Sequence, residues 1–179
     1  MAVVVDTNVA VVAEGLSTIA DATCVARCQD ALLDIVRSGG LLLDDGNAIV
    51  AEYVGTLGHA GQPGVGRAFA KWVFNYQFDP VCCSRVRLTA CSDDGWRSYE
   101  EFPDDDRLRA FDRDDQKFVS VAVASCQHPP ILNAVDSDWT EHEVALADCG
   151  VLVRQLCTEQ VDRRTFHRAR RSGDARLAE

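Results

Sequence analysis

Several features of exported and membrane proteins are missing from this sequence. No apolar run approaches the roughly 18 residues that a membrane-spanning helix needs, and the first six residues contain neither a basic segment nor a long apolar stretch. We therefore expect a soluble, cytoplasmic protein that does not bind membranes. Internal repeats and low-complexity stretches are also missing. Of the 179 residues, 47 % are apolar, which is enough for the core of one domain.

The cysteine and histidine spacing of a zinc site is missing too. No two cysteines have the C-x-x-C spacing, and the histidines are scattered, which argues against a structural zinc site. The eight cysteines lie mostly in apolar stretches, at positions 24, 28, 82, 83, 91, 126, 149 and 157. Because no secretion signal precedes them, we expect buried free thiols rather than disulfides.

Basic residues are few until the end of the chain. The formal net charge is −10, whereas residues 161–179 contain six arginines against three acidic residues. We therefore expect one domain over residues 1–159 and an Arg-rich tail over 160–179. Arg163, Arg164 and Arg168 are candidate nucleic-acid contacts, although an acidic partner or a tail without fixed structure explains them equally well. An acidic domain repels nucleic acid unless cations intervene.

The hydrophobic pattern predicts alternating strands and helices. Apolar residues recur at helical spacing over 24–36, 49–57, 65–76, 115–127 and 139–148, and short apolar runs at 3–5, 41–43, 86–88, 131–135 and 151–156 predict strands. Asp21 is placed to cap the first helix and Gly39 to end it. Residues 80–110 are predicted as a loop or lid. The alternation favours an α/β fold around a mostly parallel sheet.

Two aspartates stand where predicted strands end. Asp6 follows the strand at 3–5, and Asp136 follows the strand at 131–135. The carboxyl ends of parallel strands lie at one edge of the sheet, where α/β proteins bind ligands. If these two strands are neighbours, the two carboxylates converge at that edge.

Three more acidic residues can reach the same edge. Glu52 lies on the second predicted helix, Asp115 at the start of a later one, and Asp138 two residues after Asp136. Carboxylates packed so closely repel one another unless a hard cation neutralises them. The cluster therefore predicts Mg²⁺ or Mn²⁺, which can activate water and stabilise the charge of a phosphoryl transition state.

Each of these residues also has an ordinary interpretation. Asp115 and Asp138 can cap helices, and Glu52 can be a solvated helix residue. Lys117, a candidate phosphate contact, is more often a solvated charge. Asp112, Asp114 and Asp115 lie so close together that each is a candidate for the third acid of the site. We favour Asp115 because it stands three residues before Phe118.

The order of these motifs resembles the PIN domain, a family of metal-dependent ribonucleases that includes VapC-like toxins. The matching motifs are Val3-Val4-Val5-Asp6-Thr7-Asn8, Ile49-Val50-Ala51-Glu52-Tyr53, Asp114-Asp115-Gln116-Lys117-Phe118-Val119 and Val135-Asp136-Ser137-Asp138-Trp139. The resemblance implies a three-layer α/β/α sandwich with strand order 3-2-1-4-5. It also implies the following roles: catalytic acids at Asp6, Glu52, Asp115 and Asp136, metal ligands at Asp6, Asp115, Asp136 and Asp138, and supporting residues at Thr7 and Asn8.

The function implied by the resemblance is a Mg²⁺- or Mn²⁺-dependent endoribonuclease. Such a protein acts on RNA, as a toxin or defence effector restrained by an inhibitory partner protein, and members of the family often form homodimers. The extra segment at 80–106 and the Arg-rich tail are more typical of a stand-alone member. A non-catalytic module that binds RNA or protein is an alternative. A haloacid-dehalogenase-like phosphatase is another, although Asn8 stands where that mechanism needs an acid.

Overall fold

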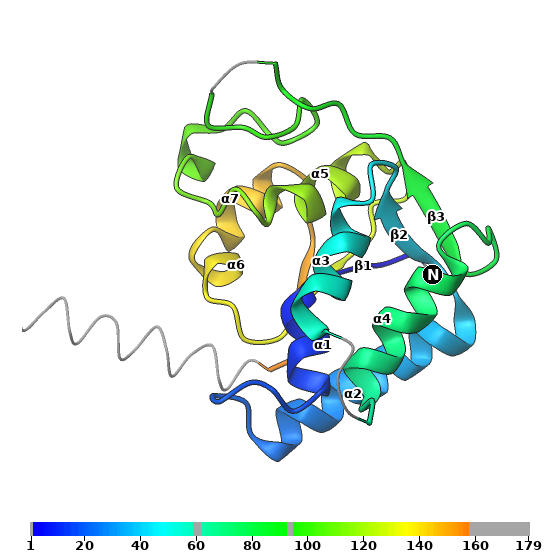
Figure 1. The fold of residues 1–179 in the computed structure, drawn as a ribbon. Helices are drawn as coiled ribbons and strands as arrows, with labels where there is room; N and C mark the ends of the chain where they lie inside the picture. Colours follow the sequence, from blue (N-terminus) through cyan, green and yellow to red (C-terminus); the bar gives the residue numbers. More distant parts are fainter. Residues whose placement is uncertain (1, 59–61, 93–94, 158–179) are drawn as a thin grey trace, which may run out of the picture.

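The computed structural model describes residues 2–58, 62–92 and 95–157, and its centre is a parallel sheet (Figure 1). The strands are β1 (Val4–Val5), β2 (Leu41–Asp44), β3 (Cys83–Val86), β4 (Ile131–Asn133) and β5 (Val153–Gln155). β2 pairs with β3, and β4 lies between β1 and β5. A parallel bridge between Val3 and Leu41 joins the two parts. The resulting order, 3-2-1-4-5, agrees with the order that we expected.

Helices cover both faces of this sheet. The first four pack against one another: α1 (Thr7–Ala13), α2 (Ala22–Ser38), α3 (Ala48–Leu57) and α4 (Val65–Tyr76). α5 (Gln116–Ala124) packs against β1, β2 and β4, and α6 (Asp138–Glu141) and α7 (Glu143–Asp148) follow β4. Right-handed crossovers place α1–α4 on one face and α5–α7 on the other, because the strand order reverses after β3. The fold is α/β in three layers.

Helix α2 shows how the sequence sets its own boundaries. The Asp21 carboxylate accepts a hydrogen bond from the backbone N–H of Cys24 at 2.9 Å, and Gly39 ends the helix with a φ of +69°. A side chain at Gly39 would also strike the carbonyl oxygen of Val81. The predicted cap and stop are therefore both confirmed.

Four local predictions are wrong in detail. No helix was predicted directly after Asp6, where α1 begins. The third strand covers Cys83–Val86 rather than residues 86–88, and β4 ends at Asn133, three residues before Asp136. The helix predicted over 139–148 is broken at His142 into α6 and α7.

The segment 80–110 is more ordered than a simple loop. It contains β3, an antiparallel bridge between Ala90 and Tyr99, and a short 3-10 helix at Asp106–Leu108. Phe102 and Leu108 are fully buried, and the Phe102 ring packs against Phe111, which meets Trp139 edge to face. Part of this segment therefore belongs to the core next to α6.

The prediction of free thiols is wrong for two cysteines. Cys24 on α2 and Cys157 after β5 form a disulfide across a sequence separation of 133 residues. The sequence could not indicate this pair, because only the fold brings residues so distant together. The remaining six cysteines are free, but only Cys28 and Cys83 are buried, so the prediction of buried thiols fails for the other four. Among the described residues, no helix is long and apolar enough to cross a membrane.

Candidate metal centre

Asp6 is the most buried acidic residue of the candidate site. It links β1 to α1, and its Oδ1 accepts a hydrogen bond from the backbone N–H of Asn8 at 2.8 Å. Its Oδ2 accepts a second hydrogen bond, at 2.6 Å, from the indole Nε1 of Trp139. Both bonds fix the carboxylate, whose residue is only 3 % exposed.

Asp115 and Asp136 bring two more carboxylates to Asp6. Asp115 stands at the start of α5, and Asp136 lies in the turn between β4 and α6. One ligand oxygen from each of the three carboxylates lies within 4.8 Å of the other two. The predicted convergence of Asp6 and Asp136 is confirmed, and Asp115 is the third acid that the sequence left open.

Two of the three carboxylates, Asp6 and Asp115, have raised pKa values. Burial, together with the nearby charge of Asp136, raises the pKa of Asp6 to about 7. Burial, together with repulsion from Asp6 and Asp136, raises the pKa of Asp115 to about 8. Without a cation, at least part of the cluster therefore holds protons near neutral pH.

A hard divalent cation suits these residues. Mg²⁺ prefers one or two carboxylates together with water, and Mn²⁺ shares that preference for oxygen ligands. The hydroxyl Oγ1 of Thr7, next to Asp6 in the chain, is buried and has no hydrogen-bond partner among the described residues. It therefore does not orient the Asp6 carboxylate. Asp6, Asp115 and Asp136 would hold the ion.

Asn8 and Asn133 hold the two halves of the site together. The Asn8 side chain donates to Oδ1 of Asn133 at 2.8 Å and accepts from the backbone N–H of Ala134 at 2.9 Å. Asn133, which is fully buried, donates to the carbonyl oxygen of Asp136 at 2.8 Å. Asn8 lies beside the site as expected, whereas Asn133 was missed. A lone amide inside an apolar strand was the signal that could have identified it.

Glu52 lies near the cluster but forms an ion pair. Its carboxylate contacts the ammonium of Lys117, which also donates to the carbonyl oxygen of Asp114. Lys117 is only 6 % exposed, so the favoured interpretation as a solvated charge is wrong, and a phosphate contact stays a prediction. The charge of Glu52 still reaches Asp6 and contributes to its raised pKa.

Other predicted site residues take different positions. Asp138 is not among the three converging carboxylates: it begins α6, and its backbone N–H donates to Oδ1 of Asp136 at 3.0 Å. The predicted cap by the Asp138 side chain is therefore not observed, and its role as an additional metal ligand stays a prediction. Asp112 accepts from the backbone N–H of Asp114, so both lie in the turn before Asp115. Arg163, Arg164 and Arg168 lie outside the described residues.

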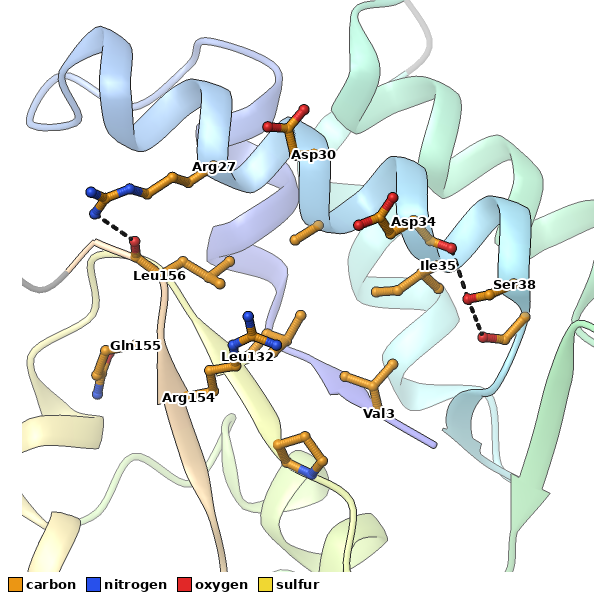
Figure 2. Close-up of a pocket in the computed structure, with 13 residues that line it drawn as sticks. Val3, Arg27, Asp30, Asp34, Ile35, Ser38, Leu132, Arg154, Gln155 and Leu156 are labelled. Atoms are coloured by element: carbon orange, nitrogen blue, oxygen red, sulfur yellow. Dashed lines mark hydrogen bonds between the residues drawn. The ribbon is translucent and has the colours of Figure 1, made fainter. Parts of the chain in front are cut away.

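A separate cavity of about 520 Å³ lies between α2 and the strands β1, β4 and β5 (Figure 2). Arg27, Asp30 and Asp34 line it from α2, and Arg154 lines it from β5. None of the three converging aspartates lines this cavity. This cavity therefore does not mark the candidate site, which is placed by the convergence of the three carboxylates.

Comparisons of this chain with profiles of known protein families, with curated proteins and with solved structures found no match.

Proposed function

We propose that this chain is a Mg²⁺- or Mn²⁺-dependent endoribonuclease, with its metal centre at Asp6, Asp115 and Asp136. The observation that carries the proposal is the convergence of these three carboxylates within 4.8 Å at the carboxyl edge of a parallel sheet. Three acids this close are costly without a cation, and a cation is what an acidic protein needs to accept a phosphodiester.

The chemistry follows from the residues that surround the cation. When bound, the ion supplies a more acidic water and neutralises charge on the phosphoryl oxygens. Asp6 is fixed by Asn8 and Trp139 and therefore holds its side of the site rigidly. Asp136, in the turn after β4, and Asp115, at the start of α5, supply the other two carboxylates. Glu52, although paired with Lys117, keeps negative charge close enough to favour a divalent ion.

Cleavage of mixed single-stranded and structured RNA tests this function. We expect cleavage with Mg²⁺ or Mn²⁺ and none in EDTA, with a loss of about 100-fold or more in Asp6→Asn and Asp136→Asn, because each removes a ligand charge. Asp34→Asn, at an exposed acid on α2, is the matched control and should cleave normally. Unchanged cleavage in both site variants would refute the assignment.

The two alternatives predict different results in the same assay. A non-catalytic module would bind RNA without cleaving it and would not need metal. A haloacid-dehalogenase-like phosphatase would hydrolyse a generic phosphomonoester. Asn8 argues against that enzyme, because its amide is engaged with Asn133 and Ala134 and offers no acid.

The biological setting remains part of the proposal. An RNA substrate follows from the nuclease chemistry, and an inhibitory partner protein, a homodimer and a role as a toxin or defence effector follow from the resemblance to PIN domains. A cytoplasmic location fits these roles. In such a reducing compartment the Cys24–Cys157 disulfide would be open, with both cysteines present as thiols.

A further inference from the structure

A second group of candidate ligands lies on another part of the molecule. The sulfur atoms of Cys24, Cys28 and Cys157 all lie within 4.8 Å of one another, and all three residues are buried. Cys24 and Cys157 form the disulfide, and the Cys28 sulfur lies 3.9 Å from that of Cys157. A disulfide needs two of these sulfurs. The third sulfur, that of Cys28, takes no part in that bond.

The fold, rather than sequence proximity alone, assembles this cluster. Cys24 and Cys28 stand one turn apart on the buried face of α2, and β5 delivers Cys157 to that face. Figure 2 shows Arg27 of α2 reaching the end of β5, where its Nη1 donates to the carbonyl oxygen of Leu156 at 3.3 Å. The two elements are therefore held together by a contact that does not depend on the disulfide.

The spacing of the sulfurs suits a metal ion. At a Zn–S distance of about 2.3 Å, two sulfurs on a tetrahedral ion lie about 3.8 Å apart. The Cys28–Cys157 distance of 3.9 Å is close to this value. The three-residue gap between Cys24 and Cys28 is also within the ligand spacing of zinc sites, which a search for C-x-x-C alone overlooks.

Charged groups near the three sulfurs bear on the net charge of a metal–thiolate site. Three thiolates on a divalent ion leave one net negative charge. The guanidinium of Arg27, on the carbonyl oxygen of Leu156 next to Cys157, offsets part of such a charge, and the N-terminal end of α2 near Cys24 adds to this, opposed by the Asp21 carboxylate that accepts from the Cys24 N–H.

We propose that Cys24, Cys28 and Cys157 form, in the reduced protein, a thiolate site for Zn²⁺, and that the disulfide is the oxidised, metal-free state of this site. Among the described residues, no fourth histidine, cysteine or acidic residue joins the group, so the chain supplies three ligands. The site is separate from the carboxylate cluster and takes a softer ion.

The change between the two states balances with a dithiol reductant. The dithiol transfers two electrons and two protons to the Cys24–Cys157 bond, which opens to two thiols, and the dithiol becomes its own disulfide. Zn²⁺ then displaces protons from Cys24, Cys28 and Cys157 to solvent. In the reverse direction a disulfide-bonded compound takes two electrons from the Cys24 and Cys157 thiolates and is reduced to two thiols, the Cys24–Cys157 bond forms, Cys28 regains a proton and the ion is released.

The test uses the full chain, reduced with a dithiol under anaerobic conditions and then freed of the reductant. Thiol counting in denaturant should rise from six to eight on reduction, since two of the eight cysteines are bonded. Co²⁺, a spectroscopic substitute for Zn²⁺, should then give a thiolate-to-metal charge-transfer band that saturates at one sulfur-bound equivalent, whatever Co²⁺ the carboxylate cluster also binds. Added Zn²⁺ should abolish that band, and the oxidised protein should show none.

Cys28→Ser is the decisive variant, because it keeps both partners of the disulfide. We expect it to retain the oxidised thiol pattern but to lose more Zn²⁺ affinity than the 10–100-fold that outer contacts provide. Cys126→Ser, at an exposed cysteine, is the control and should bind normally. The double variant Asp6→Asn/Asp136→Asn should keep the band, because it changes only the carboxylate cluster.

Three results would overturn the proposal. One is a fully reduced protein that binds no Co²⁺ and no Zn²⁺. Another is a band of unchanged intensity and metal affinity in Cys28→Ser, which would show that this sulfur is not a ligand. The third is reduced protein that binds metal without a thiolate band and loses that binding in Asp6→Asn/Asp136→Asn.

Discussion

The indole of Trp139 donates a 2.6 Å hydrogen bond to Oδ2 of Asp6, although 133 residues separate them in the chain. Trp139 is fully buried against Phe111, so packing holds the indole in place. This bond lowers the pKa of Asp6 against the effect of burial. Trp139 therefore positions Asp6 and also favours the ionised form of its carboxylate, which is the form that would bind a metal ion.

Replacing this indole should move the pH dependence of metal binding. In Trp139→Phe the ring remains but the donor is lost, so the pKa of Asp6 should rise above about 7. We expect weaker Mn²⁺ binding at pH 7, by the 1.5–3 kcal/mol typical of a bond to a charged group, and recovery at higher pH. Calorimetric titrations across pH measure this. Trp72→Phe, on α4, is the control, and an equal loss at every pH would indicate a purely structural effect.

The metal-free protein should become less stable as pH rises. The pKa values of Asp6 and Asp115 are raised in the folded state to about 7 and about 8, from 3.8. Between pH 4 and pH 8 the folded state therefore binds more protons than the unfolded state, and its free energy of unfolding falls. Urea unfolding in EDTA at pH 5.5 and pH 8 measures this. Saturating Mn²⁺ should restore more stability at pH 8. Equal stability at both pH values would contradict the raised pKa values.

Removing one charge from the cluster should stabilise the metal-free protein. Asp115→Asn takes away a buried carboxylate that Asp6 and Asp136 repel. We expect the free energy of unfolding in EDTA at pH 8 to rise by about 1–3 kcal/mol, while Mn²⁺ binding and RNA cleavage fall. Asp114→Asn, at the neighbouring exposed acid, should change neither. A destabilised Asp115→Asn in EDTA would argue that the carboxylates do not repel one another.

The Lys117–Glu52 pair should matter for both stability and metal binding. Lys117→Met leaves Glu52 without its partner and removes a charge that lowers the pKa of Asp115. We expect a loss of about 3 kcal/mol of folding free energy and weaker Mn²⁺ binding at pH 7. Lys117→Met/Glu52→Leu should be more stable than Lys117→Met alone, because no unpaired charge remains. Chemical unfolding of the set measures this coupling, and strict additivity would contradict it.

Most helices could be predicted because local signals were strong, whereas the strand order was expected only from the resemblance to PIN domains. Asp21 and Gly39 mark both ends of α2, and short apolar runs mark β1 and β2. Helix α1 was missed because its sequence, rich in Val and Ala, is as apolar as a buried strand. Asp6 as a cap for Asn8 was the available signal, but the interpretation of Asp6 as a site residue obscured it.

The acidic residues of the candidate site could be predicted, but the side chains that they contact could not. The rule that strand ends share one edge was enough to bring Asp6 and Asp136 together. The Lys117–Glu52 pair and the Trp139–Asp6 bond depend on how α3, α5 and α6 pack, which no local pattern encodes. The same holds for Cys24 and Cys157, whose approach requires both α2 and β5 to be in place.

Binding of one divalent cation by Asp6, Asp115 and Asp136 is tested by an anomalous-scattering map from a crystal of the protein grown with Mn²⁺. We expect a single strong peak within about 2.0–2.4 Å of a carboxylate oxygen from each of the three residues. An empty cluster at saturating Mn²⁺, with all three side chains ordered, would rule out the proposed metal centre.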